Sequence, residues 1–350
     1  MKVLQVIDTL KVGGAERVLV TLSNLLYKKG VEVSVLILVE DGVLVKELES
    51  NIRVYRLERN RRFEKNKMKI FSEIIKGFDI IHTHLKHNYR YTSIVSKRFK
   101  LSSQKFIFHD HSHILGVSKL SKKYIKDFLF KNVLKPPYYI GVSAGNCDWA
   151  KSYLKVRKEN CYLLENIVEK NKKNKPDIKR EGIVIVSNIT PIKNLEFAIE
   201  IVKKLKEKVT IYGRVIDEGY FKILNNKIKE YKIENQVSFI SDCNEVQQEL
   251  YQFKYALHTS FKETGPLVLI EYLAQSLPFL SFETGQVYTS MGSKIPQFFI
   301  NNFAVDNWVK KIEEISAVSQ KTIKAVYENN FSSEKYIDKC LKIYQDIQNS

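Results

Sequence analysis

The chain has 350 residues, 44% of them apolar and 27% charged, which suits about two domains with buried cores and excludes a largely disordered protein. Glycine and proline are too few for a fibrous chain, and the longest apolar runs fall far short of the ~20 residues that span a bilayer. The N-terminus reads as a strand and lacks the features of a signal peptide. Four cysteines without two-residue spacing indicate neither disulfides nor a cysteine zinc site, so we expect a cytoplasmic protein with reduced thiols.

The net charge of +18 comes entirely from the first half of the sequence. Residues 1–175 contain 35 Lys and Arg against 17 Asp and Glu, whereas residues 176–350 contain 22 of each kind. A one-sided positive field attracts phosphate polymers or an anionic membrane surface. The two halves are therefore expected to meet different partners.

Short β-branched runs alternate with helical patterns along both halves, which is typical of βαβ units with parallel sheets. The predicted strands of the first half are residues 3–7, 31–39, 52–57, 79–83, 105–109, 138–142 and 161–164. Those of the second half are residues 182–187, 209–213, 237–240, 256–260 and 278–282.

The sequence predicts a first domain over residues 1–168, a lysine-rich linker over 169–180, a second domain over 181–330 and a C-terminal helix over 331–350. Apolar residues recur at helical spacing in this last segment, so we expect it to dock back on one domain. Ligands bind outside the carboxyl ends of parallel strands, which places the expected site in strand-to-helix loops facing a cleft between the domains.

The first such loop contains Gly13 and Gly14, between a strand and a helix predicted over residues 15–29. Two glycines let the backbone approach a ligand closely, and the helix start offers N–H groups to a phosphate. The pattern is not that of a nicotinamide or flavin site. Alternatively, the two glycines only form a tight turn that requires positive φ.

The most specific segment is SFKETGPLVLIEYLAQSLP at residues 260–278. Pro266 suits the first turn of a helix, so the N–H groups of Gly265, Leu267 and Val268 would favour a diphosphate, and Thr264 is assigned to the same donor site. Glu263 in the loop and Glu271 in the helix can accept hydrogen bonds from sugar or ribose hydroxyls. Taken by themselves, two glutamates eight positions apart are more often explained by capping and a solvated helix charge.

Together these motifs resemble the retaining glycosyltransferases of family 4, which have the GT-B fold of two Rossmann-like domains. The resemblance covers nearly the whole chain. It is carried by GGAER at residues 13–17, by Glu263 and Glu271 around GPL, by Pro278, and more weakly by IGVS at 140–143, LENIV at 164–168 and VSNITPIKN at 186–194.

The resemblance implies a nucleotide-sugar substrate, a metal-independent reaction and no cofactor. It assigns Glu271 to the ribose, Glu263 to the donor sugar and Lys193 to a phosphate. The family usually has an arginine at Asn188, so Lys193 would act with helix N–H groups or with Arg214. The usual glycine-rich turn is reduced to the segment YGRV at residues 212–215, and Ser276 stands where a glycine is usual.

Histidines follow two predicted strands of the first half, His82, His84 and His87 after one and His109, His111 and His113 after the other. Alternation along a strand puts His82 and His84 on one side, as zinc ligation would permit. Imidazoles at strand ends can equally meet phosphates and sugar hydroxyls. By resemblance His109 corresponds to a histidine beside the donor sugar, with His111 as the alternative if the alignment shifts by two.

A basic cluster of the first half contains Lys122, Lys123 and Lys126 and is interleaved with aromatic residues. Such a segment can bind an anionic membrane or an acidic acceptor, although an ordinary helix packed on a core gives the same pattern. Nucleic acid is not expected, because the aromatic residues form no stacking platform.

We therefore expect a hexosyltransferase that moves a sugar from a nucleotide-diphosphate sugar, a UDP-sugar by preference, to a glycan or lipid-linked acceptor in bacterial surface polysaccharide synthesis. Two alternatives stay open. One is a nucleotide-sugar epimerase of similar fold. The other is a non-catalytic nucleotide-sugar-binding subunit, which Asn188 and the reduced glycine turn favour.

Overall fold

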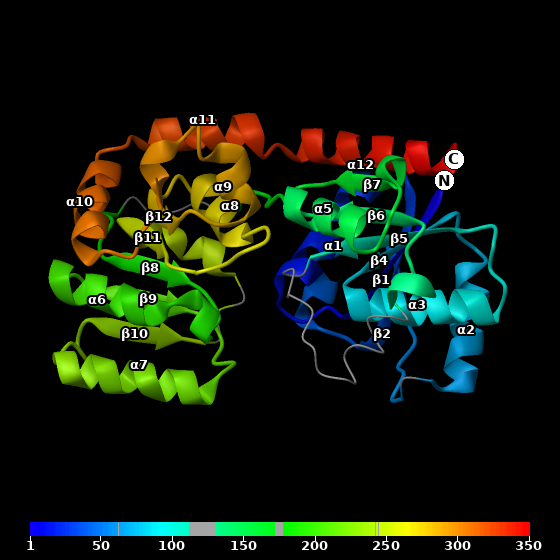
Figure 1. Cartoon of the computed structure of the whole chain (residues 1–350), viewed down its shortest axis with the longest axis horizontal. Coiled ribbons are helices and arrows are strands. Elements are labelled where there is room, and N and C mark those ends of the chain that lie inside the picture. The colour runs from blue at the N-terminus through cyan, green and yellow to red at the C-terminus, as the bar shows by residue number, and fades with distance from the viewer. Residues whose placement is uncertain (62, 112–129, 172–177, 242, 244) are drawn as a thin grey trace. The chain divides into compact units, whose positions relative to one another are not determined.

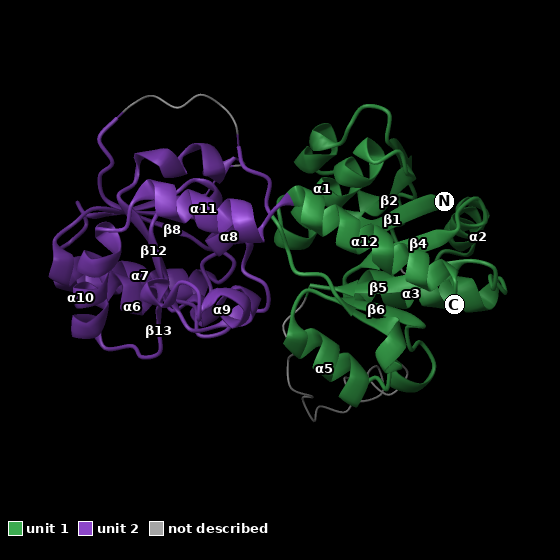
Figure 2. Cartoon of the chain, turned by 90° about the horizontal axis from the view of Figure 1, so that it is seen from above, with its two compact units in different colours: residues 1–167, 333–350 green, residues 168–332 purple. Residues whose placement is uncertain are grey.

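The computed structural model describes residues 1–61, 63–111, 130–171, 178–241, 243 and 245–350, and in it the chain forms two compact units. Unit 1 comprises residues 1–167 and 333–350, and unit 2 comprises residues 168–332 (Figure 2). Each unit has a parallel sheet and its own hydrophobic core. The predicted class, α/β with two Rossmann-like parallel-sheet domains, is confirmed.

The sheet of unit 1 has seven parallel strands in the order β3-β2-β1-β4-β5-β6-β7 (Figure 1). Its central strands are buried on both faces, which explains why they contain apolar runs such as residues 35–39. The strands are β1 (Lys2–Thr9), β2 (Glu32–Glu40), β3 (Arg53–Arg56), β4 (Ile80–His84), β5 (Lys105–Asp110), β6 (Tyr138–Gly141) and β7 (Cys161–Leu163).

Helices complete unit 1, and the last of them arrives from the far end of the chain. The helix α12 (Ser333–Gln348) follows the last helix of unit 2 but packs in unit 1, where Tyr336, Ile337, Cys340 and Tyr344 join its core (Figure 2). The predicted docking of a C-terminal helix is confirmed. The other helices are α1 (Gly14–Lys28), α2 (Lys65–Ile75), α3 (Lys86–Arg98) and α5 (Ala144–Ser152).

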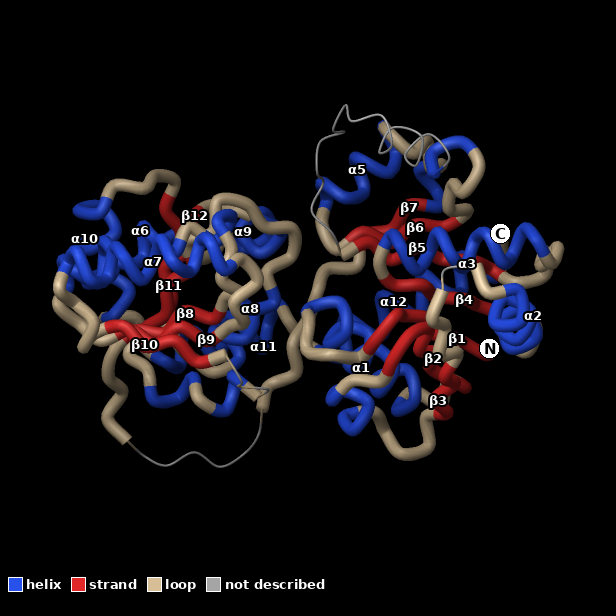
Figure 3. Tube along the Cα trace, turned by 90° about the horizontal axis from the view of Figure 1, so that it is seen from below, coloured by secondary structure: helices blue, strands red, loops and turns tan. Residues whose placement is uncertain are grey.

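The sheet of unit 2 has six parallel strands in the order β10-β9-β8-β11-β12-β13 (Figure 3). The strands are β8 (Ile183–Val186), β9 (Val209–Tyr212), β10 (Val237–Ile240), β11 (Tyr255–His258), β12 (Phe279–Phe282) and β13 (Phe299–Ile300). The helices are α6 (Leu195–Leu205), α7 (Glu218–Tyr231), α8 (Leu267–Ala274), α9 (Gly285–Met291), α10 (Val305–Ser316) and α11 (Gln320–Asn330). The sequence did not predict β13, because two residues carry no readable alternation.

The described part of the expected linker belongs to unit 2. Val168 already lies in the core of that unit, and the guanidinium of Arg180 donates hydrogen bonds to the carbonyl oxygens of Gln275 and Ser276. These contacts explain why the flanks of the lysine-rich stretch pack against unit 2. Among the described residues, no helix has both the length and the apolar composition needed to cross a bilayer.

Candidate active site

The sheet of unit 2 reverses its strand order at one point. β9 and β10 lie on one side of β8, whereas β11, β12 and β13 lie on the other. The loops that follow β8 and β11 therefore leave the sheet in opposite directions, which opens a crevice at the carboxyl ends of these two strands. Lys193 follows β8 and Glu263 follows β11, so both occupy this position.

Two hydrogen bonds join the loops after β8 and β11. The backbone N–H of Phe261 donates to the carbonyl oxygen of Ile192 at 3.0 Å, and the hydroxyl of Thr259 donates to that of Lys193 at 2.9 Å. Asn194 adopts a left-handed conformation with φ of 52°, ending the short 3₁₀ turn Pro191–Lys193. These contacts hold the backbone of Lys193 beside the loop that carries Glu263.

Glu263 is the centre of an electrostatic cluster. Its carboxylate lies 2.5 Å from Lys193 Nζ and 3.4 Å from His258 Nε2, while its side chain is only 9% exposed and that of His258 4%. Burial by itself raises the pKa of Glu263, but His258 and then Lys193 reverse this effect and hold the pKa well below its usual range. Glu263 is therefore an anion in the folded protein.

The loop after β12 supports Glu263 from the other side. The backbone N–H of Glu263 donates to the hydroxyl of Thr284 at 3.0 Å, and that of Gln286 donates to the carbonyl oxygen of Thr264 at 2.7 Å. Gly285 has φ of +79°, and a Cβ there would lie 2.9 Å from Pro266 Cδ and 3.0 Å from Glu263 Cβ. Only glycine fits this position without moving the loop.

The helix α8 begins at Leu267, one residue later than predicted. Pro266 has an extended backbone, with ψ of 104°, and stands immediately before the first turn. Gly265 and Pro266 thus form the approach to the helix, whose first N–H groups favour an anion. Glu271 lies four residues into the helix and is half-buried. The next residue, Tyr272, accepts a hydrogen bond from the backbone N–H of Val186 and so ties α8 to β8.

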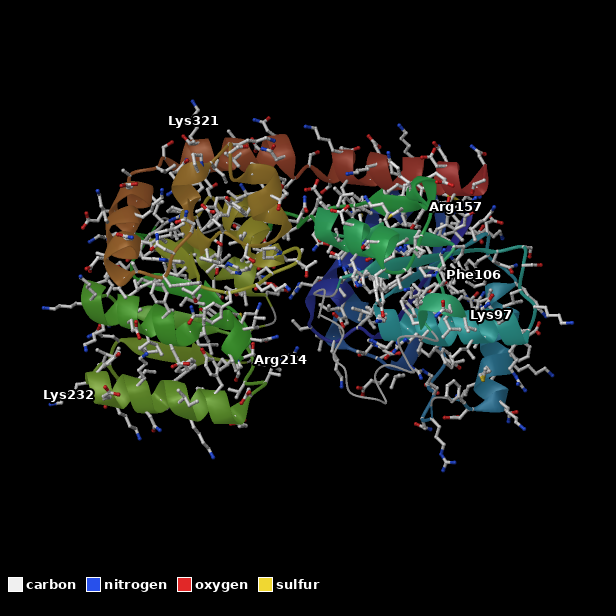
Figure 4. The ribbon with its side chains drawn as sticks, in the orientation of Figure 1. Lys97, Phe106, Arg157, Arg214, Lys232 and Lys321 are labelled. Carbon is white, nitrogen blue, oxygen red and sulfur yellow. The ribbon has the colours of Figure 1, made fainter. Side chains whose placement is uncertain are left out.

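Arg214 follows β9, the strand next to β8, and its side chain is exposed (Figure 4). Its backbone N–H donates to the side-chain oxygen of Asn188 at 3.3 Å. A Cβ at Gly213 would lie 2.0 Å from the carbonyl oxygen of Ser187, so the reduced turn keeps the one glycine that the approach of the two loops requires. Asn188, where the family has an arginine, supports the backbone that carries Arg214.

Ser276 adopts φ of 52°, a left-handed conformation that glycine reaches without the cost a Cβ brings. The glycine that the resemblance implies at this position would have a conformational reason.

Gly13 and Gly14 lie in unit 1, at the junction of β1 and α1. Gly13 has φ of −169°, which is extended backbone, and α1 begins at Gly14. The alternative explanation, a tight turn that requires positive φ, is wrong for this loop. A Cβ at Gly13 would meet the Glu16 carboxylate at 2.3 Å, so its lack of a side chain leaves room for that carboxylate.

Four histidines gather in unit 1 where β4 and β5 end, since the register pairs His84 with His109. His82 Nε2 lies 3.0 Å from His109 Nδ1, and His84 Nδ1 lies 2.9 Å from His111 Nε2. Burial lowers the pKa of His82 and His111 to about 3 and those of His84 and His109 well below their usual range. All four rings are therefore neutral at physiological pH.

His82, His84 and His109 bring ligand nitrogens within 4.8 Å of one another, a spacing at which a metal is conceivable. Of their six ring nitrogens, all but His109 Nε2 already bond to each other, to His111 or to other side chains, so a cation would have to displace those bonds. His87 lies outside the group, since its Nε2 pairs with Asp8 Oδ2 at 2.9 Å. His113 and the membrane candidates Lys122, Lys123 and Lys126 lie outside the described residues.

The structure thus brings Lys193 and Glu263 together and places Thr264, Gly265, Pro266, Leu267 and Glu271 along the same loop and helix. It adds His258, Thr284 and Gly285, which the sequence analysis missed. His258 was the one histidine outside the two clusters, and it ends the strand just before the most specific segment. Its place at the end of a strand, directly before that segment, could have identified it as a candidate site residue.

Two family models match the chain. Residues 166–332 match the model described as Glycosyl transferases group 1, and residues 12–172 match the model described as Glycosyltransferase Family 4. No curated protein sequence matches the chain significantly.

Solved structures resemble the chain over its whole length. The Anabaena protein Alr3699/HepE in complex with UDP-glucose has 16% identity and a TM-score of 0.80, with 100% of each chain covered. A glycosyltransferase from Rickettsia africae has 17% identity and a TM-score of 0.78, with 99% of this chain and 98% of that one covered. A sucrose-phosphate synthase from Thermosynechococcus elongatus has 14% identity and a TM-score of 0.72, with 99% of each covered. At such identities the likeness establishes the fold.

Proposed function

Because the chain belongs to the group 1 glycosyltransferases of GT-B fold, whose models together match residues 12–332, we propose that it transfers a hexose from a UDP-sugar with retention of anomeric configuration. The preference for uridine is supported by the Anabaena protein of the same fold, whose structure holds UDP-glucose. The observation that carries the proposal is the buried, anionic Glu263 between Lys193 and His258 at the switch point of the unit 2 sheet.

Within this proposal the donor lies at the N-terminus of α8. The diphosphate meets Lys193, Arg214 and the backbone of residues 264–267, where the helix dipole and the two cations favour negative charge. Glu271 accepts hydrogen bonds from the ribose hydroxyls, and Glu263 accepts them from the sugar. Lys193 then serves both the carboxylate and a phosphate. The resemblance also assigns Gly13, Gly14 and His109 of unit 1 to donor binding, and the proposal includes these assignments.

The remaining parts of the proposal concern the acceptor and the metal. The acceptor is a glycan or lipid-linked glycan of a bacterial surface polysaccharide, and the reaction needs no metal, since two cationic side chains and helix N–H groups serve the diphosphate. The basic first half holds the protein at an anionic membrane surface through Lys122, Lys123 and Lys126. The excess of positive charge in residues 1–175 supports this last part.

Release of UDP from a panel of UDP-hexoses tests the donor part. Glu263→Gln should lower turnover about a hundredfold, because a carboxylate that faces the reacting sugar acts mainly in the transition state, while UDP affinity stays within about twofold. The matched control is Glu313→Gln, which removes a carboxylate on the exposed face of α10 and should change neither quantity. Equal losses of turnover rate and UDP affinity would contradict the assignment of Glu263 to the donor sugar. The anomeric configuration of the product, read by NMR, tests retention.

Two outcomes favour the other functions. Tight nucleotide binding without any turnover, in the presence of glycan acceptors, indicates a binding subunit, which the supporting rather than cationic role of Asn188 would suit. Interconversion of sugar stereochemistry without transfer indicates an epimerase.

Vesicle sedimentation tests the membrane part. Each lysine near an anionic surface adds about 1 kcal/mol, an attraction that salt screens. We expect binding to anionic but not neutral vesicles at low salt, and loss of that binding when Lys122, Lys123 and Lys126 are replaced by Glu. Equal partition onto both kinds of vesicle contradicts the proposal.

A further inference from the structure

Gln5 sets the direction of the hydrogen bonds in the histidine cluster of unit 1. Its side-chain oxygen lies 2.8 Å from His84 Nε2, and its side-chain nitrogen lies 3.3 Å from the Tyr344 hydroxyl. A carbonyl oxygen only accepts and an amide nitrogen only donates. His84 therefore carries a proton on Nε2, and the Tyr344 oxygen accepts from Gln5.

The Tyr344 hydroxyl in turn donates to His82. Its oxygen lies 2.6 Å from His82 Nδ1, and its one proton is not used toward Gln5. The thiol of Cys340 also faces this hydroxyl, but a thiol is a weaker acceptor than an imidazole nitrogen. His82 Nδ1 is therefore the acceptor, and the ring carries no proton there.

The tautomers of His82 and His109 follow one from the other. Each ring is neutral and has one N–H, so His82 carries its proton on Nε2 and donates it across 3.0 Å to His109 Nδ1. His109, accepting at Nδ1, carries its own proton on Nε2. Its side chain is fully buried, and Nε2 has no hydrogen-bond partner among the described residues.

The hydrogen bond between His84 and His111 also joins one donor to one acceptor. With its proton on Nε2, His84 accepts at Nδ1, and His111 Nε2 lies 2.9 Å away as the donor. Every contact of the cluster then joins one donor to one acceptor. Among the residues that the structure describes, the group left over at the core of the cluster is the N–H of His109.

We propose that Gln5 and Tyr344 are positioning residues that fix His109 in the tautomer with its proton on Nε2. His109 thereby has an N–H rather than a lone pair at Nε2, and because this atom is buried, a donor sugar would receive its hydrogen bond only after the groups that cover it move aside. The sugar-facing part rests on the function proposed above, whereas the tautomer does not. Because Tyr344 lies on α12, the returning C-terminal helix supplies a proton donor to the core of unit 1 as well as apolar surface.

NMR of the full chain labelled with ¹⁵N-histidine tests the tautomer directly, because protonated and unprotonated ring nitrogens have well-separated shifts. Spectra are recorded at neutral pH with a chelator and without nucleotide, and the signals of His109 are identified by their loss in His109→Asn. We expect the Nε2–H tautomer at both His82 and His109. The Nδ1–H tautomer at His109 in the wild-type protein overturns the proposal.

Two variants test what sets the tautomer. In Gln5→Glu the carboxylate only accepts, so Tyr344 must donate to it and accept from His82 Nδ1, which reverses both His82 and His109. In Tyr344→Phe the donor to His82 is gone, so both tautomers should be populated. The matched control is Tyr336→Phe, which removes a buried hydroxyl of the same helix that has no hydrogen-bond partner within the described part of the chain, and it should leave the spectra unchanged. Unchanged tautomers in Tyr344→Phe overturn the proposal, whether or not Gln5→Glu folds.

Kinetics separate this inference from the proposed function. Tyr344→Phe should lower UDP release from a UDP-hexose about tenfold at saturating donor and leave UDP affinity unchanged, whereas Tyr336→Phe should keep the wild-type rate. A protein that shows the predicted tautomers but releases no UDP overturns the sugar-facing role together with the proposed function, and supports the tautomer assignment. Full activity in Tyr344→Phe with mixed tautomers overturns the sugar-facing role alone.

Discussion

The ion pair of Lys193 and Glu263 predicts a stability change that can be measured without any substrate. In Lys193→Met the carboxylate of Glu263, 9% exposed, loses its lysine partner and keeps only the His258 ring nearby, at 3.4 Å, in this cluster. Removing one member of a buried pair costs about 3–5 kcal/mol, and we expect the lower end because Lys193 is 22% exposed. Adding Glu263→Gln removes the buried charge that has lost its lysine partner, and should restore about 2 kcal/mol of the free energy of unfolding.

Urea unfolding followed by tryptophan fluorescence measures this coupling in unit 2 alone. The chain has two tryptophans, and a Trp149→Phe background leaves Trp308, fully buried in the unit 2 core, as the only reporter. The control Lys254→Met breaks a more exposed pair with Glu207 and should cost less than about 1 kcal/mol. Additive effects of the two site substitutions would refute the reasoning, because residues that share an ion pair must couple.

The same pair predicts a pH dependence with a definite sign. Since His258 and Lys193 hold the pKa of Glu263 below its unfolded value of about 4.5, the unfolded chain binds a proton first as the pH falls. The contribution to stability is complete above pH ~4.5 and is lost below it at about 1.4 kcal/mol per pH unit. Between pH 5 and 3 the wild-type protein should lose about 2 kcal/mol more than Glu263→Gln. Parallel profiles would contradict this assignment.

Three further predictions concern the ligand, the loop and the metal. Glu271→Gln should weaken UDP at least about tenfold in isothermal titration, since a charge-assisted hydrogen bond is worth about 1.5–3 kcal/mol, whereas Glu313→Gln should bind UDP as the wild type does. Gly285→Ala should destabilise unit 2 by at least about 1 kcal/mol more than Gly30→Ala destabilises unit 1 in urea. Both have positive φ, but only Gly285 is crowded. Chelation with EDTA should leave UDP release from the donor unchanged, and a loss that zinc or magnesium restores would overturn the metal-independent proposal.

The strands and helices of both units could be predicted from the sequence, because each depends on a pattern of neighbouring residues. Strands buried on both faces need continuous apolar runs, such as residues 35–39, and their helices need apolar residues at helical spacing. The same logic identified α12, whose Tyr336, Ile337, Cys340 and Tyr344 recur at that spacing. It missed β13, two residues long, and it assigned residues 178–180 to a linker because Arg180 finds its carbonyl partners about 95 residues further along the chain.

The candidate site could be predicted only in part from the sequence. The sequence by itself determined which loops carry chemistry, because parallel strands bring their carboxyl ends to one edge and because the segment at residues 260–278 is specific. It could not show that Lys193 bonds to Glu263, or that His258 lies behind them, because these contacts join the ends of separate strands. Tertiary structure alone decided the tautomers of the histidine cluster, in which Gln5 and Tyr344 meet across 339 positions of the chain. A hydrogen bond depends on the position and direction of two atoms in space, and no local pattern of residues encodes that.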